Sequence, residues 1–227
     1  MQAEEMMVLA CSKKWGGRCV AGISSRSGRW LRPVSTLPHG ELTPYHYRIE
    51  GREICPFDLI RFEYEGGLSD PSQPENVAVA AGRWELMGRV DPADADDVLS
   101  RHVVDGPVLL GNRGAAMPED DARMGVEASL ALVRPREVEF HLEPPWEGTS
   151  RARPRAAFEL DGQSYDFALT DYMVAPRLMK AGLGSHGLAD LGVAPGSAIY
   201  LTVSLAEARD DWCTKLVAAV LVLPKRA

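Results

Sequence analysis

The sequence predicts a mainly β protein with minor α content, arranged as two small β-barrels in tandem. Three observations lead to this prediction. Short apolar segments, several with an alternating apolar and polar pattern, recur along both halves of the chain. Sixteen prolines and 21 glycines are spread over the whole length, as expected for short strands separated by turns. The 227 residues suffice for two units of about 100 residues each.

The first half of the chain contains three short apolar segments followed by a clear amphipathic strand. Residues 6–11, 18–23 and 29–34 are separated by polar or glycine-containing turns and form a predicted meander. Residues 58–65 alternate apolar and polar side chains, which is the pattern of a strand with one buried face. The apolar stretch 76–90 is expected to supply the closing strand of the first unit.

Three segments of the first half are expected to lie outside its strands. Residues 35–56 contain several prolines and are predicted to be a loop. Residues 92–104 carry acidic side chains in their first turns, which favours a short helix. Residues 106–121 are rich in glycine and proline and are predicted to be a linker. The predicted domains are therefore 1–120, a first barrel with a trailing helix and linker, and 121–227, a second barrel.

The second half contains more strands and one clear helix. The predicted strands are residues 126–133, 137–142, 156–160, 164–169, 197–205 and 214–223. Asp161 and Gly162 form a strong hairpin signal between two of these strands. Thr170 or Asp171 can cap a helix that runs to about residue 180 and ends at Gly182.

The order of these elements predicts the type of barrel. Three strands, a helix and two closing strands is the order of an OB-fold, which is a small five-stranded barrel. The second half fits this order better than the first, where no helix is expected between the third and fourth strands. A single β-sandwich would also accommodate about ten short strands and remains an alternative.

Charge is distributed unevenly along the chain. The net charge is −7, which argues against a protein that coats DNA by bulk charge alone. Residues 1–34 nevertheless carry a net charge of +4, while the remainder carries −11. The N-terminal segment is therefore the first candidate for a surface that attracts phosphate.

The sequence predicts neither a metal site nor a cofactor site. The four cysteines have no CxxC spacing and no histidine pair at zinc-ligand spacing accompanies them, so buried, reduced thiols are expected. No phosphate-binding glycine loop of a known type follows a predicted strand. The chain begins without a signal peptide and contains no apolar stretch of membrane-spanning length, so we expect no membrane contact and a cytoplasmic location.

The predicted binding residues combine cations and aromatic rings on a barrel frame. Aromatic rings can stack on bases and cations can contact phosphates, and OB-folds bind oligonucleotides on their second and third strands and first loop. The residues with these properties are Lys13, Lys14, Trp15, Arg18, Arg29, Trp30 and Arg32. The alternative is that Trp30 packs in the barrel and that the cations are a solvated surface.

A second candidate group lies in a short polar segment. Gln73, Glu75 and Asn76 offer two amides and a carboxylate that could read the edge of a base. These side chains could equally cap a turn before a strand. Ser204 and Lys215 lie on neighbouring predicted strands but lack the spacing of a known nucleophile and base, so no catalytic residue is predicted.

Several short motifs resemble one known family. They are ACSKK at 10–14, GRCVAG at 17–22, GRWLRPV at 28–34, PSQPEN at 71–76, YLTVSL at 200–205 and CTKLVA at 213–218. These segments are similar to the dual OB-containing domain proteins of bacteria, and the resemblance spans nearly the whole chain. It implies two OB-like barrels and the recognition of nucleic acid or nucleotide, in the setting of bacterial defence or mobile elements.

The predicted function is non-enzymatic binding of nucleic acid, single-stranded or modified, by the basic and aromatic face of the first barrel. One alternative is a sensor that holds a nucleotide between the two barrels. Another is an adaptor with a protein partner in a defence or mobile-element system. A nucleic-acid-processing enzyme is the least favoured alternative, because it would need a cluster of catalytic residues assembled from distant segments.

Overall fold

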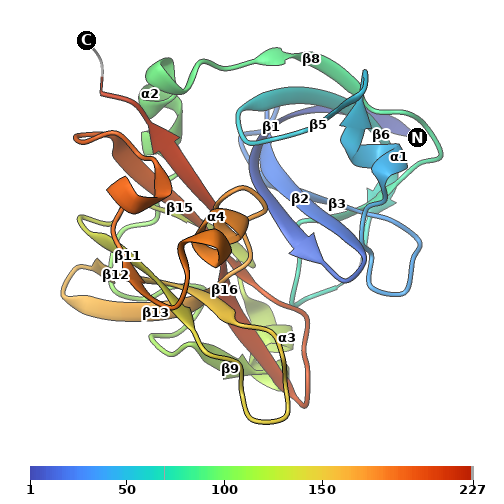
Figure 1. Cartoon of the computed structure of the whole chain (residues 1–227). Coiled ribbons are helices and arrows are strands. Elements are labelled where there is room, and N and C mark those ends of the chain that lie inside the picture. Colours follow the sequence, from blue (N-terminus) through green and yellow to red (C-terminus); the bar gives the residue numbers. More distant parts are fainter. Residues whose placement is uncertain (69, 226–227) are drawn as a thin grey trace.

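Two β-sheets, each curved into a barrel, contain most of the regular structure of the chain (Figure 1). The computed structural model describes residues 1–68 and 70–225. The predicted fold class, mainly β with minor α and two small OB-like barrels in tandem, is confirmed. Within the described residues, no helix is both long enough and apolar enough to cross a membrane.

The first barrel closes because its first strand pairs with two others. Its strands are β1 (Gln2–Lys14), β2 (Gly17–Ser24), β3 (Trp30–Val34), β6 (Asp58–Gly67) and β7 (Asn76–Val79). They follow the order β1-β2-β3-β7-β6, and β6 pairs back with β1. A register shift between Val8 and Ala10 marks the point where the pairing of β1 with β2 becomes irregular, as a bulge in a bent strand does. The pairing of β3 with β7 is parallel, which matches the OB-fold.

The segment between β3 and β6 is more ordered than predicted. The expected loop contains the one-turn helix α1 (Pro44–Tyr47) and a small hairpin of β4 (Arg48–Ile49) and β5 (Arg52–Glu53). Proline at the first helical position and a bond from the backbone N of Thr43 to Nδ1 of His46 explain the helical turn. This turn occupies the chain position at which the second barrel has its longer helix.

The apolar stretch after Asn76 forms two strands instead of one. β7 closes the barrel by pairing with residues 64–67 of β6, whereas β8 (Glu85–Arg89) pairs with residues 58–61 at the other end of the same strand. The predicted helix that follows is divided into the short helical turns η1 (Pro92–Asp94), α2 (Asp96–Leu99) and η2 (Ser100–His102). The side chain of Asp91 accepts a hydrogen bond from the backbone of Ala93 and caps the first of them.

The second barrel has the strand order of an OB-fold with its first strand divided. Its strands are β10 (Leu130–Val133), β11 (Val138–Glu143), β12 (Arg153–Leu160), β13 (Gln163–Leu169), β15 (Ala198–Leu205) and β16 (Trp212–Leu223). They follow the order β10-β15-β16-β13-β12-β11, and β13 is parallel to β16. β10 and β11 stand at opposite ends of this order, but they are consecutive in the chain because residues 134–137 join them.

Turn and cap residues of the second barrel lie where the sequence places them. Asp161 and Gly162 both have positive φ, at 46° and 78°, which is the conformation of a tight hairpin turn. Asp171 accepts hydrogen bonds from the backbone of Met173 and Val174 at the start of α4 (Val174–Ala181). Gly182, with φ of 97°, ends the helix.

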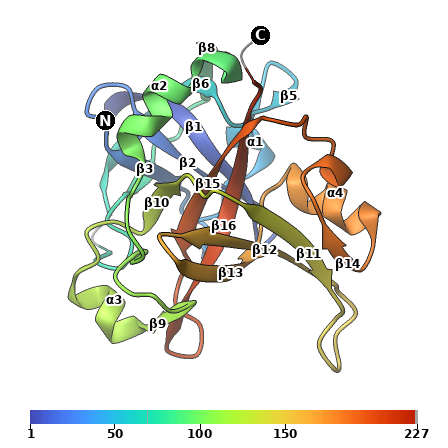
Figure 2. The ribbon, with the colours of Figure 1, turned by 90° about the vertical axis from the view of Figure 1, so that its left-hand side faces the viewer.

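Smaller elements flank the second barrel on two sides. β14 (Gly184–His186) pairs with β11 and is followed by η3 (Ala189–Leu191). Figure 2 shows α4 and β14 on one side of the barrel, and β9 (Ala116–Pro118) with α3 (Glu119–Gly125) on the other. β9 pairs with β16, so the end of the predicted linker is part of the second sheet. The boundary near residue 120 stays a prediction.

Each barrel has its own hydrophobic core, and a third buried cluster is built by both barrels together. Met7, Leu9 and Ile23 of the first barrel pack in the same buried cluster as Leu132 and Tyr200 of the second. β16 runs alongside β1 at this junction (Figure 1). Because outward-facing residues of β1 and β2 are buried here, the second barrel covers part of the surface that an isolated OB-fold offers to a ligand.

Candidate nucleic-acid interface

Arg32, predicted to contact nucleic acid, lies in a buried polar network between the barrels. Its side chain is 2% exposed. Its Nη2 donates to Oγ of Ser129 at 3.0 Å and to Oγ of Ser204 at 3.1 Å, and its Nη1 donates to Oδ1 of Asn76 at 3.4 Å. Its Nε has no hydrogen-bond partner in the described part of the chain. The guanidinium therefore holds the junction together and does not reach the surface.

The predicted base-reading segment also faces the second barrel. Oε2 of Glu75 accepts from Oγ of Ser129 at 2.8 Å, and its other oxygen accepts from the backbone N of Ser129 and Leu130. Nε2 of Gln73 donates to the carbonyl of Leu205 at 3.1 Å, and Oε1 of Gln73 accepts from Nδ2 of Asn76. These bonds explain why the polar residues can be buried. In this structure the segment joins the barrels, and a role in base reading stays a prediction.

A cleft at the edge of this network brings two of the predicted residues together with a second aromatic ring. Arg29 and Trp30 lie on one wall, Tyr64 and Pro74 line it as well, and Glu127 contributes from the chain leading into β10. We call this the junction cleft. It is lined by Gly28, Arg29, Trp30, Leu31, Tyr64, Gly67, Pro74, Glu75, Asn76, Val77, Glu127 and Ala128 and has a volume of about 460 Å³. This size falls within the range of small-ligand sites.

The rings of the junction cleft are held in place from behind. Trp30 is half-buried and packs against the buried cluster that both barrels build. The alternative that Trp30 packs inside the protein therefore applies to part of its ring. The hydroxyl of Tyr64 donates to Oε1 of Gln2 at 2.8 Å. Supported aromatic rings lose little conformational freedom when a flat ligand stacks on them.

The charged side chains around the junction cleft differ in whether they already bind other groups of the protein. Arg29 is exposed, and among the described residues no carboxylate lies within ion-pair distance of it. The Glu75 carboxylate is bound to Ser129 and Leu130, whereas Glu127 is exposed. Arg32 adds a buried positive charge behind Asn76. The cleft therefore combines one exposed cation, Arg29, and two aromatic rings with the exposed carboxylate of Glu127, while Arg32 lies behind the lining residues.

The turn between β1 and β2 carries three of the predicted residues. Lys13 is exposed, while Nζ of Lys14 forms an ion pair with Oε1 of Glu207 at 2.6 Å. Trp15 is 70% exposed and stacks on His39 with ring centroids 3.9 Å apart. We call Lys13, Lys14 and Trp15 the hairpin tip. Its exposed cation and exposed ring leave it accessible to a ligand.

Arg18 is used within the protein. Its guanidinium carbon lies 3.4 Å from the ring centroid of Tyr172 and 5.2 Å from that of Tyr47. Its Nη2 lies 3.5 Å from Oε2 of Glu53. These contacts link the first barrel to Tyr172, which follows β13 of the second.

The structure thus divides the predicted basic face into separate groups. The hairpin tip is at one end of β2, and Trp30 pairs with Ile23 near the other end. Six residues of strand between Gly17 and Ile23 correspond to about 20 Å. Arg29 and Trp30 remain together in the junction cleft, whereas Arg18 and Arg32 face other protein groups.

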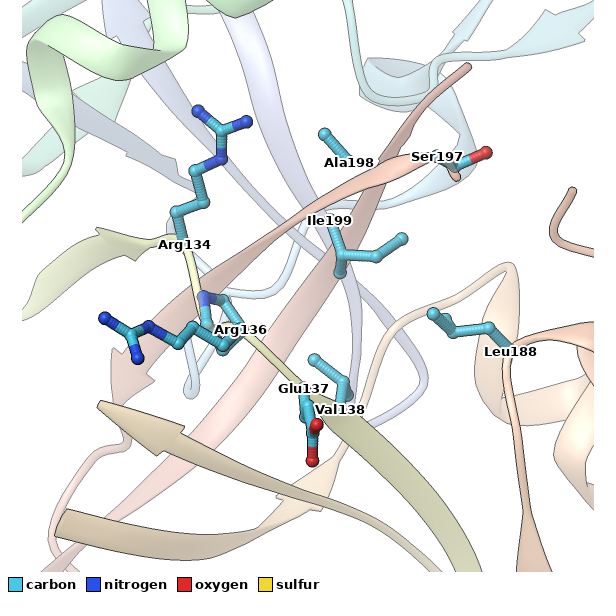
Figure 3. Close-up of a pocket in the computed structure, with 9 residues that line it drawn as sticks. Arg134, Arg136, Glu137, Val138, Leu188, Ser197, Ala198 and Ile199 are labelled. Atoms are coloured by element: carbon cyan, nitrogen blue, oxygen red, sulfur yellow. The ribbon is translucent and has the colours of Figure 1, made fainter. Parts of the chain in front are cut away.

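A larger hollow lies where the first strand of the second barrel is interrupted. Its floor is apolar, formed by Val138, Leu188 and Ile199, and its volume is about 660 Å³ (Figure 3). Arg134 and Arg136 stand at its rim. We call it the Arg134 groove; it is lined by Arg134, Pro135, Arg136, Glu137, Val138, Leu188, Ser197, Ala198 and Ile199.

One cluster on the outer face of the second barrel has the composition of a metal site. Ligand atoms of His141, Glu143 and Asp166 lie within 4.8 Å of one another. Arg155 Nε lies 3.0 Å from Oδ1 of Asp166, and Arg153 Nη2 lies 2.9 Å from Oε2 of Glu143. These arginines already supply positive charge to the carboxylates, so the arrangement is that of an ion-pair network.

Sequence reasoning missed several residues of these sites. Tyr64 lies in a strand whose residues alternate between apolar and polar. This pattern does not indicate that its ring lines the junction cleft together with residues from other segments. Ser129 and Ser204 are short polar residues in apolar stretches, and their pairing with Arg32 depends on how the barrels dock. Arg134 and Arg136 flank a proline after a buried strand, and this interruption was a usable signal.

Comparisons with known proteins identify the family but no specific function. No curated protein matches the chain. Among solved structures, the chain is similar to the tetrameric p202 HIN2, with 10% identity over 98% of this chain and 92% of that chain. The TM-score is 0.30, at which the similarity carries no argument about this chain. The model of the dual OB-containing domain matches residues 4–220, and the chain therefore belongs to this family.

Proposed function

We propose that this protein binds nucleic acid, with a base of a single strand stacked in the junction cleft. The observation that carries the proposal is the presence of Trp30 and Tyr64 in one cleft with Arg29, which is exposed and forms no ion pair in the part of the chain that the structure describes. Base stacking on an aromatic ring contributes about 1–3 kcal/mol per base, and it is tolerant of sequence because each base has a flat face. Arg29 is placed to contact the phosphate beside that base.

The charge of the chain favours a short contact over broad coating. With a net charge of −7, an extended duplex would be repelled by most of the surface. A flexible single strand can present one or two bases to the cleft and direct its other phosphates toward local cations. The OB-like frame agrees with this role, although the fold alone does not decide it.

A free nucleotide is the second candidate ligand. The junction cleft has a volume of about 460 Å³, which suits a single nucleotide as well as one unit of a strand. A nucleotide sensor would use the same ring stacking and the same cation. The two candidates differ in whether neighbouring nucleotides of a strand add affinity.

Fluorescence anisotropy with labelled 12-nucleotide oligo-dT and oligo-U at low salt tests the proposal. Trp30→Leu is expected to weaken binding about 5- to 150-fold, the equivalent of about 1–3 kcal/mol. Arg29→Glu changes an exposed side chain, so it is expected to weaken binding with no loss of folding. Trp146→Leu and Arg151→Glu are the matched controls, because both side chains are exposed on the loop between β11 and β12.

Two results would contradict the proposal. One is the absence of salt-dependent binding of either oligonucleotide by the unmodified protein. The other is an equal loss of affinity in the cleft variants and the control variants. Thermal shift with mononucleotides separates the second candidate, since a bound nucleotide raises Tm by mass action and Trp30→Leu should abolish that rise.

A further inference from the structure

The junction cleft and the Arg134 groove lie at the two ends of one strand. Glu127 and Ala128, just before β10, line the cleft, and Arg134, just after β10, stands at the groove. Six residues along an extended chain separate positions 128 and 134, which corresponds to about 20 Å. At about 3.4 Å per stacked nucleotide, this distance is spanned by about six nucleotides of a single strand.

The segment that begins with η2 and continues to Val104 runs beside β10, between the two hollows. Val103, which follows η2, pairs with Leu132 in the middle of β10. His102 of η2 lies close to Gly28, because a Cβ atom added to this glycine would be 3.7 Å from Cε1 of His102. η2 therefore approaches Arg29, which is the next residue in the chain. Arg101 is exposed on η2, and no carboxylate in the described ranges is within ion-pair distance of it. This segment therefore offers a cation between the cleft and the groove.

The arginines of the groove differ in how they are held. The guanidinium carbon of Arg134 lies 5.2 Å from the ring centroid of Tyr200, and its Nη1 lies 3.6 Å from Oδ1 of Asp96. The hydroxyl of Tyr200 donates to the same oxygen of Asp96 at 2.7 Å. These contacts fix Arg134 while its side chain stays 48% exposed. A guanidinium that is already positioned pays less entropy when it contacts a phosphate.

Arg136 is free of such contacts. It is exposed, and no ion pair to it is formed within the residues that the structure describes. Figure 3 shows Arg134 and Arg136 on one side of the groove and Glu137 pointing away from Arg134. Asp96 already pairs with Arg134, so Arg136 is the groove arginine whose charge is free for an incoming phosphate within the described residues.

We propose that the Arg134 groove is a second contact for the same nucleic-acid strand, which runs from the junction cleft across η2 to Arg134 and Arg136. The inference rests on the proposed function, because it takes the cleft as the point where a base is held. The cleft supplies stacking, and the groove supplies phosphate contacts about six nucleotides away. Strands too short to span the two hollows gain nothing from the groove.

Binding of oligo-dT of four and twelve nucleotides, measured over a series of salt concentrations, tests this inference. The double variant Arg134→Glu/Arg136→Glu is expected to bind the 12-nucleotide strand at least about tenfold more weakly and to lower the salt slope by about 1.4, since single strands show a slope of about 0.7 per phosphate contact. Its affinity for the four-nucleotide strand should stay within about twofold of the unmodified protein. The matched control is Arg151→Glu/Arg209→Glu, which makes the same change of charge at two exposed arginines outside the path.

The outcomes separate this inference from the proposed function. An unchanged salt slope in the groove variant, or an equal loss in the control, overturns the second contact while Trp30→Leu still reports on the cleft. An equal loss for the short and the long strand also overturns it, because the groove would then act on a single site. If neither strand binds the unmodified protein, the proposed function fails and the path fails with it.

Discussion

Nη2 of Arg32 in the first barrel donates a hydrogen bond to Oγ of Ser204 in the second barrel at 3.1 Å. The same nitrogen donates to Ser129, whose hydroxyl donates in turn to Glu75. Within the described residues, no carboxylate lies within ion-pair distance of Arg32. The charge of Arg32 and that of Glu75 are therefore linked through one shared serine. This network fixes how the barrels dock and thus the shape of the junction cleft.

The first prediction concerns the stability of this junction. Glu75→Ala removes the acceptor of the backbone N–H groups of Ser129 and Leu130. Each buried N–H that is left without a partner costs about 1–3 kcal/mol. The variant should therefore unfold at a clearly lower urea concentration. Glu139→Ala, at an exposed carboxylate on β11, is the control and should leave the midpoint nearly unchanged.

The second prediction concerns pH and Lys215, which is 2% exposed. Burial lowers the pKa of Lys215 from 10.5 to about 8. Between these values Lys215 binds more protons in the unfolded chain than in the folded chain, so its contribution to the free energy of unfolding should rise with pH from about 8 to about 10.5. The rise from this side chain should be on the order of 3 kcal/mol, and below pH 8 the full cost of the buried charge remains. Burial raises the pKa of the Cys11 thiol from 9.0 to about 12, which opposes this rise above pH 9, so a comparison with a Lys215 variant is needed.

Lys215→Met isolates this effect. Nζ of Lys215 donates to the carbonyl and to Oδ1 of Asn112 at 2.8 and 2.7 Å, so the variant also loses two hydrogen bonds. The loss of these two hydrogen bonds changes the free energy of unfolding by an amount that does not follow the titration curve of Lys215. Urea unfolding from pH 7 to 10.5 should show a smaller rise in Lys215→Met than in the unmodified protein. Parallel curves would show that Lys215 stays charged in the fold.

The third prediction compares the hairpin tip with the junction cleft. Because about 20 Å of strand separates them, a base in the cleft leaves Lys13 at the margin of the binding path. Lys13→Glu should weaken binding of a four-nucleotide strand by less than twofold, and Arg29→Glu should weaken it by about tenfold. Both side chains are exposed, so neither change should alter folding. A larger loss for Lys13→Glu would move the binding site to the hairpin tip.

Much of the fold could be predicted because its signals are local. The alternation of apolar residues in β6, the turn at Asp161 and Gly162, and the cap and end of α4 each depend on neighbouring residues. The helical turn α1 and the division of residues 76–90 into β7 and β8 were not predicted. The turn α1 rests on a local cap, formed by Pro44 and the bond between Thr43 and His46, that the predicted loop overlooked. The division into β7 and β8 depends on pairing with β6, which a local pattern does not contain.

The candidate site was predicted in part, for a reason that is visible in Arg32. A strand pattern places Trp30 and Arg32 on one face, and both do lie toward the second barrel. The sequence does not reveal that this face is covered, because Ser129 and Ser204 are about 100 residues or more away in the chain. Arg29 and Trp30 reach a cleft only because Tyr64 and Glu127 come beside them in the docked barrels.

In the proposed function, a base of a single strand stacks in the junction cleft, which Trp30 and Tyr64 line. Photo-crosslinking with a 12-nucleotide strand that carries 5-bromodeoxyuridine, followed by mass spectrometry of the digested protein, locates that base. We expect adducts on the peptides that contain Trp30 or Tyr64, and we expect these adducts to be lost when unlabelled strand competes. Adducts confined to Trp15 of the hairpin tip or to Trp146 on the loop after β11, with none in the cleft, would contradict the proposed function.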